Sequence, residues 1–243
     1  MLDKALKDRK FHYCAGCGHS IMHRLIAGCI DEMGIREKVI GIAPVGCAVF
    51  AYDYFNFDML EVPHGRPPAA ATAIKRVHPS CSVFTYQGDG DLAAIGLSEI
   101  MHAAMRGENI TVFFVNNATY GMTGGQMAPT SLMGQVTSTT PRGRKDGAPF
   151  RVAELIASLE PPFFVARGSL DSREQQEITR SYVRRALEYQ ESSRGFTFVE
   201  VLSPCPTDWH MSPPEAAGWI ASDMAPTFPP GVLLDRGEGG SRE

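Results

Sequence analysis

The segment 88–117 constrains the fold of this chain more than any other. It opens with the glycine turn GDG, directly after the apolar run VFTY, and closes with an asparagine pair directly after the apolar run ITVFFV. The pattern predicts strands at about 82–87 and 110–115, joined by a helix at about 92–106. Because a helical crossover normally returns the chain parallel to its first strand, this order predicts a βαβ unit.

Both polar turns of this unit are expected at the same edge of the sheet. Asp89 supplies a carboxylate and Asn117 an amide oxygen, and Mg²⁺ prefers such oxygen ligands, completed by phosphate and water. Gly88 and Gly90 let the backbone approach a ligand closely, and the N-terminus of the next helix favours an anion. The 25 residues between GDG and the asparagine pair complete a pattern that predicts a site for a metal-bound diphosphate.

Elsewhere, predicted helices and strands alternate, which indicates an α/β fold with a doubly wound, mostly parallel sheet. The helix predicted at 19–33 precedes a strand at 39–43, and the helix at 172–193 precedes a strand at 197–203. We expect one domain over residues 1–210. Residues 211–243 are rich in proline and glycine and are predicted to be an extended or partly disordered tail.

Composition excludes several classes of protein. A length of 243 residues with 44% hydrophobic residues allows a substantial core, and a net charge of -4 gives no indication of nucleic-acid binding. No apolar run approaches the length that spans a bilayer, and residues 1–10 are charged, unlike a signal peptide. The expected protein is soluble and cytoplasmic, with no membrane partner.

The cysteines indicate metal or redox chemistry. Four of them lie in turns bounded by glycine or proline, where thiolates can point inward together: Cys14, Cys17, Cys47 and Cys205. The spacing alone does not separate an iron–sulfur site from zinc, from dithiol chemistry or from independent inert cysteines. Cys29 and Cys81 are predicted to be ordinary core residues.

Three runs, at 120–135, 45–47 and 64–75, carry a resemblance to a known family. They read YGMTGGQMAPTSLMGQ, VGC and HGRPPAAATAIK. Together with the GDG and asparagine signature, they are similar to the thiamine diphosphate-binding β subunit of 2-oxoacid:ferredoxin oxidoreductases, nearest to the 2-oxoisovalerate and 2-oxoglutarate types. The likeness covers roughly residues 12–210 and implies the thiamine diphosphate-binding fold.

The resemblance also implies roles for individual residues. It implies Asp89, Asn117 and Thr119 as Mg²⁺ ligands, and Cys14, Cys17, Cys47 and Cys205 as ligands of a [4Fe–4S] cluster. The residues that it implies around thiamine diphosphate are Val45, Gly46, Cys47, Ala48, His64, Gly88, Gly90, Asp91, Tyr120, Gly121, Met122, Thr123, Gly124, Gly125 and Gln126.

His64 and Arg66 are the catalytic candidates, since the HGR element of the family places them near cofactor or substrate. A surface histidine is the alternative for His64. Arg66 offers a rigid fork of donors for a carboxylate, and the sequence leaves open whether that carboxylate belongs to the substrate or to the protein.

The activity implied by the resemblance is oxidative decarboxylation of a 2-oxoacid to acyl-coenzyme A and CO₂, with electrons passed to ferredoxin. A branched-chain substrate such as 2-oxoisovalerate is favoured, and 2-oxoglutarate and pyruvate are alternatives. The activating glutamate is expected on a partner α subunit, with further small subunits also expected. A non-oxidative thiamine diphosphate-dependent decarboxylase or synthase with a structural zinc, and a non-catalytic electron-transfer subunit, are the competing hypotheses.

Overall fold

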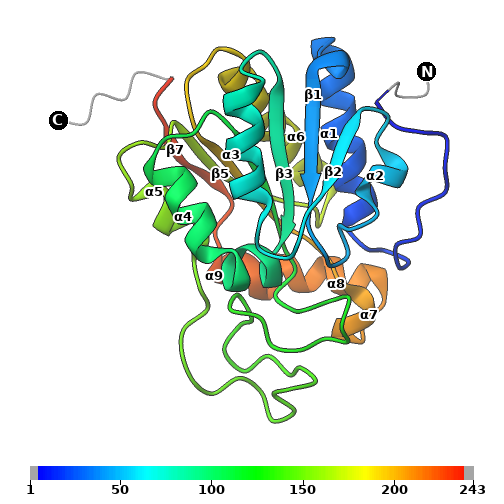
Figure 1. Cartoon of the computed structure of the whole chain (residues 1–243). Coiled ribbons are helices and arrows are strands. Elements are labelled where there is room, and N and C mark those ends of the chain that lie inside the picture. Colours follow the sequence, from blue (N-terminus) through cyan, green and yellow to red (C-terminus); the bar gives the residue numbers. More distant parts are fainter. Residues whose placement is uncertain (1–4, 238–243) are drawn as a thin grey trace.

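The computed structural model describes residues 5–237, which form one seven-stranded sheet in the order β2-β1-β3-β4-β6-β5-β7 (Figure 1). Every neighbouring pair is parallel except β5 and β7, which are antiparallel. The predicted mostly parallel α/β sheet is confirmed. The strands are β1 (Val39–Ala43), β2 (Asp58–Glu61), β3 (Ser82–Gly88), β4 (Thr111–Asn116), β5 (Phe164–Ser169), β6 (Thr197–Leu202) and β7 (Gly231–Asp235).

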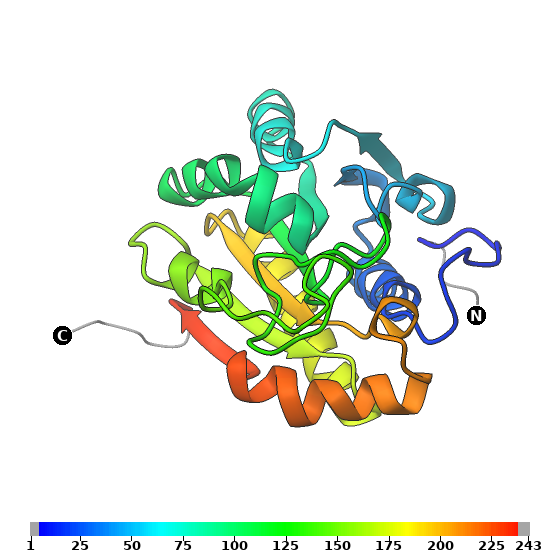
Figure 2. The same cartoon turned by 90° about the horizontal axis from the view of Figure 1, so that it is seen from below.

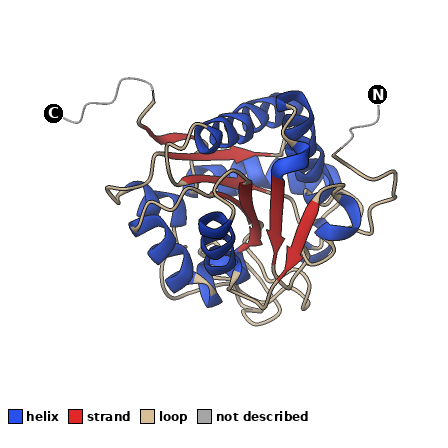
Figure 3. Cartoon of the chain, turned by 45° about the horizontal axis from the view of Figure 1, so that its top comes forward, coloured by secondary structure: helices blue, strands red, loops and turns tan. Residues whose placement is uncertain are grey.

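Helices cover both faces of the sheet (Figure 3). The α-helices are α1 (His19–Met33), α2 (Ala51–Tyr54), α3 (Pro67–Val77), α4 (Leu97–Met105), α5 (Val152–Ala157), α6 (Arg173–Glu191), α7 (Pro206–Trp209), α8 (Pro213–Trp219) and α9 (Ala225–Thr227). A 3₁₀ turn, η1 (Arg36–Lys38), precedes β1, and π-helical turns, η2 (Gly90–Ile95) and η3 (Ile220–Met224), precede α4 and follow α8.

Two hydrophobic cores lie on opposite faces of the sheet. Helices α1 and α6 pack on one face, where Phe113 is fully buried, and α3, α4 and α5 pack on the other, with Phe114. Every residue of β4 is buried, because alternate side chains of a central parallel strand enter the two cores. This arrangement fixes the carboxyl end of β4, and therefore the asparagine pair that follows.

The C-terminal region differs from the extended tail that the sequence predicted. Residues 213–227 are helical, and Ile220, Met224 and Phe228 are buried in a third apolar cluster with Leu202. Strand β7 then pairs with β5. Burial of these apolar side chains stabilises helical structure here, despite the tendency of the local prolines and glycines to disfavour it. The part of the prediction that concerns 238–243 lies outside the described residues.

The loops that follow β1, β3, β4 and β6 meet at one edge of the sheet (Figure 2). Parallel strands direct their carboxyl ends to the same side, which is where open α/β sheets bind ligands. A long excursion between β4 and α5 covers this edge (Figures 1 and 2). Within residues 5–237, no helix has the length and apolar character required to cross a membrane.

Candidate functional site

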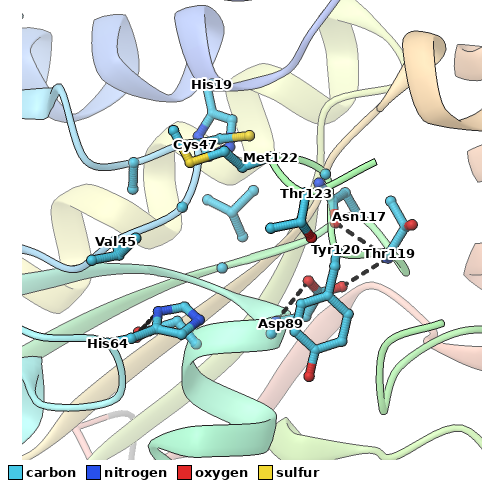
Figure 4. A pocket seen from close by; sticks show the side chains of 17 residues that line it. His19, Val45, Cys47, His64, Asp89, Asn117, Thr119, Tyr120, Met122 and Thr123 are labelled. Atoms are coloured by element: carbon cyan, nitrogen blue, oxygen red, sulfur yellow. Dashed lines mark hydrogen bonds and ion pairs between the residues drawn. The ribbon is translucent and has the colours of Figure 1, made fainter. Parts of the chain in front are cut away.

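A cavity at this edge brings together most of the predicted site residues (Figure 4). The predicted thiamine-site residues that line it are Val45, Gly46, Cys47, Ala48, His64, Gly88, Gly90, Asp91, Tyr120, Gly121, Met122 and Thr123. The predicted metal ligands Asp89, Asn117 and Thr119 line it as well. Among the described residues, Gly124, Gly125, Gln126 and Arg66 are not part of its lining.

Asp89 is a buried carboxylate at the start of η2, with an exposed fraction of 2%. Its oxygens accept hydrogen bonds from the Gly90 amide (2.9 Å), the Thr119 amide (3.2 Å) and the Thr130 hydroxyl (2.7 Å). Burial nevertheless raises the pKa of Asp89 to about 7, because these neutral donors offset only part of the desolvation. Within residues 5–237, no Lys, Arg or His forms an ion pair with Asp89. A bound cation would therefore compensate the cost of burying its negative charge.

The Asn117 amide and the Thr119 carbonyl converge with the Asp89 carboxylate. In one orientation of the Asn117 amide, its oxygen lies 3.3 Å from both Asp89 carboxylate oxygens and 2.7 Å from the Thr119 carbonyl oxygen. In the opposite orientation the amide nitrogen occupies this place and donates to the same oxygens. The first orientation suits a cation held among the oxygens, and the second suits the site without one. The donor set therefore fits Mg²⁺.

Glycines keep the backbone beside this oxygen group open. A Cβ added at Gly46 or Gly88 would meet no atom within 4 Å, so a ligand can approach the main chain there. Gly90 is different, because its Cβ would lie 2.3 Å from Cε1 of Tyr120. The Tyr120 ring thus packs directly on the glycine turn.

The loop 120–126 closes on itself above the turn. The Tyr120 amide donates to the Gln126 carbonyl (3.0 Å), and the Thr119 hydroxyl donates to the same oxygen (3.0 Å). The Thr123 hydroxyl donates to the Gln126 side chain (2.6 Å). These bonds direct residues 120–123 toward the cavity and leave Gln126 as the closing residue of the loop.

His64 and Asp91 form a histidine–carboxylate pair in the cavity wall. His64 Nδ1 lies 2.6 Å from Asp91 Oδ1, and that oxygen also accepts from the Gly65 amide (2.6 Å). The Gln87 amide donates to the other carboxylate oxygen (2.5 Å). The hydrogen bond with Asp91 raises the pKa of His64 above its usual value. Asp91, which lines the cavity, therefore also orients His64.

Arg66 lies outside the cavity lining and forms an ion pair with Glu99 of α4. Of the two carboxylate sources that the sequence left open, the structure provides the one from the protein. A direct role for Arg66 toward a substrate carboxylate thus has no support from this geometry.

We expect the Asp91→Asn variant to lower the pKa of His64, measured by NMR titration of the imidazole resonances. Asparagine retains an acceptor for Gly65 but removes the negative charge that favours the imidazolium. The pair contributes stability below the ordinary His pKa near 6.5, and this contribution is lost as pH rises through the raised pKa. Asp53→Asn, which removes a carboxylate paired with Arg9, is the control. An unchanged His64 pKa in Asp91→Asn would contradict this account.

Comparison with known proteins decides the family. The model of the family "Thiamine pyrophosphate enzyme, C-terminal TPP binding domain" matches residues 44–201, which contain the cavity's glycine turn and asparagine pair. The chain belongs to this family. Thiamine pyrophosphate is the same compound as thiamine diphosphate, so the resemblance predicted from the sequence is confirmed.

Two relatives of the chain are named as subunits of enzymes that act on 2-oxoacids. Ketoisovalerate oxidoreductase subunit VorA of Methanothermobacter thermautotrophicus is 50% identical over 93% of the chain, which covers 48% of that protein. The chain thus spans about half the length of this relative. The 2-oxoglutarate synthase subunit KorB of Methanothermobacter marburgensis is 36% identical over 83% of the chain and 68% of its own length.

A solved structure shares the fold of this chain. The 2-oxoglutarate:ferredoxin oxidoreductase of Magnetococcus marinus, with 2-oxoglutarate, coenzyme A and succinyl-CoA bound, aligns with a TM-score of 0.77. The alignment covers 98% of this chain and 84% of the other at 23% identity. This confirms the predicted fold class.

The four predicted cluster cysteines are free thiols near the same edge. Burial, with a smaller effect of neighbouring thiols, raises the pKa of Cys17 to about 11 and that of Cys47 to about 12. Burial and the hydrogen bond with Asp208 (3.1 Å) raise the pKa of Cys205. Cys14 is exposed. In the described part of the chain, no three His, Cys, Asp or Glu side chains are arranged to hold a metal ion.

The donor set of these cysteines suits an iron–sulfur or a zinc site. The thiols influence one another electrostatically, Cys17 with Cys14, Cys47 and Cys205. Ligation would require deprotonation of the thiols. The cluster therefore remains a prediction.

Sequence reasoning missed residues that support the candidate site. Thr130 donates to Asp89, and the Trp209 indole donates to the Asn117 carbonyl (3.0 Å). His19 lines the cavity and its Nδ1 lies 2.6 Å from the Tyr86 hydroxyl. Thr130 lies in the excursion after β4 and Trp209 ends helix α7, so no local motif marked them.

Proposed function

We propose that this chain is the thiamine diphosphate-binding β subunit of a 2-oxoacid:ferredoxin oxidoreductase. The reaction is oxidative decarboxylation of a 2-oxoacid to acyl-coenzyme A and CO₂, with electrons passed to ferredoxin. The observation that carries the proposal is the convergence of the Asp89 carboxylate, the Asn117 amide and the Thr119 carbonyl beside an open glycine backbone. Family membership supports the cofactor, and the names of the relatives support the reaction class.

Different residues of the chain would have separate roles at the cofactor. When bound, thiamine diphosphate supplies a carbon nucleophile and accepts the electron pair released by decarboxylation. Asp89, Asn117 and the Thr119 carbonyl would hold Mg²⁺ and through it the diphosphate. Gly88 leaves the backbone accessible, and His64, oriented by Asp91, would donate or accept a proton in the cavity.

A partner chain is part of the proposal. In the described residues, the carboxylates that line the cavity are Asp89 and Asp91, and both are engaged by the contacts given above. Neither is available to activate the aminopyrimidine ring of thiamine. Val45 and Met122 are exposed by 45% and 49% although they line the cavity, which leaves an apolar rim for an α subunit that supplies the missing glutamate.

The cysteines Cys14, Cys17, Cys47 and Cys205 would hold a [4Fe–4S] cluster that removes the electrons. Their position supports this role, since Cys47 belongs both to the cysteine group and to the cavity lining. A zinc ion is the alternative occupant of the same thiolates. A zinc-containing protein of this kind would release CO₂ without reducing ferredoxin.

The proposed substrate is a branched-chain 2-oxoacid such as 2-oxoisovalerate. The relative named as a ketoisovalerate oxidoreductase subunit is 50% identical, against 36% for the 2-oxoglutarate synthase subunit. The cavity lining suits an apolar side chain, because Val45, Val115 and Met122 contribute to it. In the described residues no lysine or arginine lines it, and a distal carboxylate would need one.

The test is turnover by the anaerobically purified chain, assembled with its partner and supplied with Mg²⁺, thiamine diphosphate, coenzyme A and ferredoxin. We expect ferredoxin reduction with 2-oxoisovalerate to exceed that with 2-oxoglutarate or pyruvate, and no turnover by the chain alone. Iron and acid-labile sulfide should be present in the purified chain and lost in Cys17→Ser.

Each outcome discriminates between hypotheses. CO₂ release without ferredoxin reduction, together with bound zinc, would identify a non-oxidative enzyme. Full turnover by the isolated chain would reject the role of the partner. Preference for 2-oxoglutarate would overturn only the proposed substrate.

A further inference from the structure

A network of buried polar side chains leads from helix α5 to the turn at residues 116–119, which carries Asn117. Asn116 Nδ2 donates to Glu200 Oε1 (2.7 Å), and Arg167 Nε donates to Glu200 Oε2 (2.9 Å). All three side chains are fully buried, on the neighbouring strands β4, β6 and β5. Arg167 also donates to Glu154 of α5 (3.0 Å) and to the Pro229 carbonyl (3.2 Å).

At the end of this network nearest the cavity, Asn116 holds a strained turn in place. Asn116 Oδ1 accepts a hydrogen bond from the Ala118 amide (3.1 Å), and Ala118 has a φ of 54°. A left-handed conformation is unfavourable for a residue with a Cβ and persists only where its surroundings impose it. The turn at Ala118 brings the Asn117 side chain and the Thr119 carbonyl together beside Asp89.

Other contacts fix the carbonyl groups of this turn but not the Ala118 amide. The Trp209 indole donates to the Asn117 carbonyl, and Ser131 (2.6 Å) and Gln135 (3.0 Å) donate to the Ala118 carbonyl. The Ala118 amide is held by Asn116. The Asn116 side chain is itself held by Glu200, which directs its nitrogen toward the carboxylate and its oxygen toward the turn.

A buried ion pair needs a reason beyond stability, because well-packed apolar residues often serve as well. Here the pair supplies a charged acceptor in a fixed place. Without Glu200, the Asn116 amide would lose the contact that distinguishes its two orientations. With the opposite orientation, its nitrogen would face the Ala118 amide, donor against donor.

We propose that Asn116 and Glu200 are positioning residues for the Mg²⁺–diphosphate site, acting through the Ala118 turn. The role rests on the proposed diphosphate site and extends it to residues that do not line the cavity. Arg167 holds Glu200 in turn, so the network reaches from Glu154 on α5 to the metal ligands.

The test measures binding of Mg²⁺ and thiamine diphosphate to the full chain, by calorimetry and by tryptophan fluorescence, since Trp209 contacts the turn. Asn116→Ala should weaken binding about tenfold or more, as loss of contacts that orient metal ligands usually does. Asn109→Ala is the matched control, since Asn109 lies two residues before the start of β4 and its side chain donates to the Gln190 carbonyl. It should bind like the original chain.

Exchanging the carboxyl and amide groups between positions 116 and 200 distinguishes a positioning role from a general loss of structure. Asn116→Asp sets two carboxylates against each other and should weaken binding about tenfold or more, by the same loss of ligand orientation. Adding Glu200→Gln reverses the hydrogen bond between the two side chains, retains an acceptor for Ala118 and keeps one negative charge. This double variant should recover most of the affinity, even if Asn116→Ala fails to fold.

The outcomes distinguish the two proposals. If the original chain and Asn109→Ala bind and Asn116→Ala binds equally well, the positioning role is overturned. If Asn116→Asp is no better with Glu200→Gln than without it, the role of Glu200 is overturned. If the original chain itself fails to bind Mg²⁺ and thiamine diphosphate, the proposed diphosphate site fails first.

Discussion

Asp89→Ala should abolish measurable binding of Mg²⁺ and thiamine diphosphate, with a loss of at least about 100-fold, or about 2.8 kcal/mol. Asp89 is the one carboxylate in the oxygen group, and it supplies the negative charge that compensates the cation. The amide and carbonyl of Asn117 and Thr119 carry no net charge, so they do not replace it. Calorimetric titration measures the loss directly.

The same variant should leave the unliganded fold intact. Burial already raises the pKa of Asp89 to about 7, so the protein gains little stability from the carboxylate itself. A ligand at 100 times its dissociation constant stabilises a protein by about 2.7 kcal/mol. The original chain should therefore show a rise in melting temperature with Mg²⁺ and thiamine diphosphate, and Asp89→Ala should show none.

Thr130→Val provides a graded control. It removes a single hydrogen bond to Asp89 and leaves the carboxylate in place, so binding should weaken by about tenfold, as for other contacts that orient metal ligands. Unchanged binding in Asp89→Ala would remove the basis for the proposed cofactor site, whatever Thr130→Val does.

The sequence predicted the part of the fold that is built from long, periodic or fully apolar segments. Strands β1, β3 and β4 and helix α1 were predicted within a residue or two. The strands are marked by short apolar runs, and the helix by a longer run with apolar residues at helical spacing. Strand β2 (Asp58–Glu61) was missed, since it is a short edge strand that is largely exposed. Strand β7 was missed because its pairing with β5 depends on the buried residues of 220–228 that precede it.

The part of the candidate site that lies within one βαβ unit was predictable from the sequence. The spacing of Asp89 and Asn117 across one βαβ unit fixes their meeting at one edge, and the glycine turns follow from the same topology. The contacts of Thr130, Trp209 and Glu200 come from distant segments, and no local pattern specifies them. Arg66 was placed near the site by its motif, but the Glu99 carboxylate one helix away binds it.

Arg167→Met should be among the most destabilising single substitutions in the chain. Arg167 is fully buried between Glu200 and Glu154, and its removal leaves the Glu200 carboxylate without a cationic partner. Breaking a buried ion pair from one side costs about 3–5 kcal/mol. For a domain of this size, that cost corresponds to a fall in melting temperature of roughly 6–20 °C. Calorimetric or circular dichroism melting measures it.

Glu200→Gln should cost less. Arg167 keeps Glu154, and a glutamine can still accept from Asn116 or from Arg167, although not with two charged contacts. The double variant Arg167→Met with Glu200→Gln contains no isolated buried charge. It should be more stable than Arg167→Met alone, and this non-additivity is the mark of a coupled pair. Additive losses would contradict the coupling.

The pH dependence of stability should show that the Glu200 carboxylate causes the lower stability of Arg167→Met. Burial raises the pKa of Glu200, and removal of the Arg167 guanidinium takes away the main influence that lowers it. A carboxyl group whose folded pKa lies above its unfolded value near 4.3 binds its proton more tightly in the folded state, so stability falls as pH rises through that interval. The deficit of Arg167→Met should therefore shrink on acidification, by up to about 1.4 kcal/mol per pH unit. In the double variant, which has no carboxyl group at position 200, this change should vanish, and its persistence would assign the loss to packing rather than to charge.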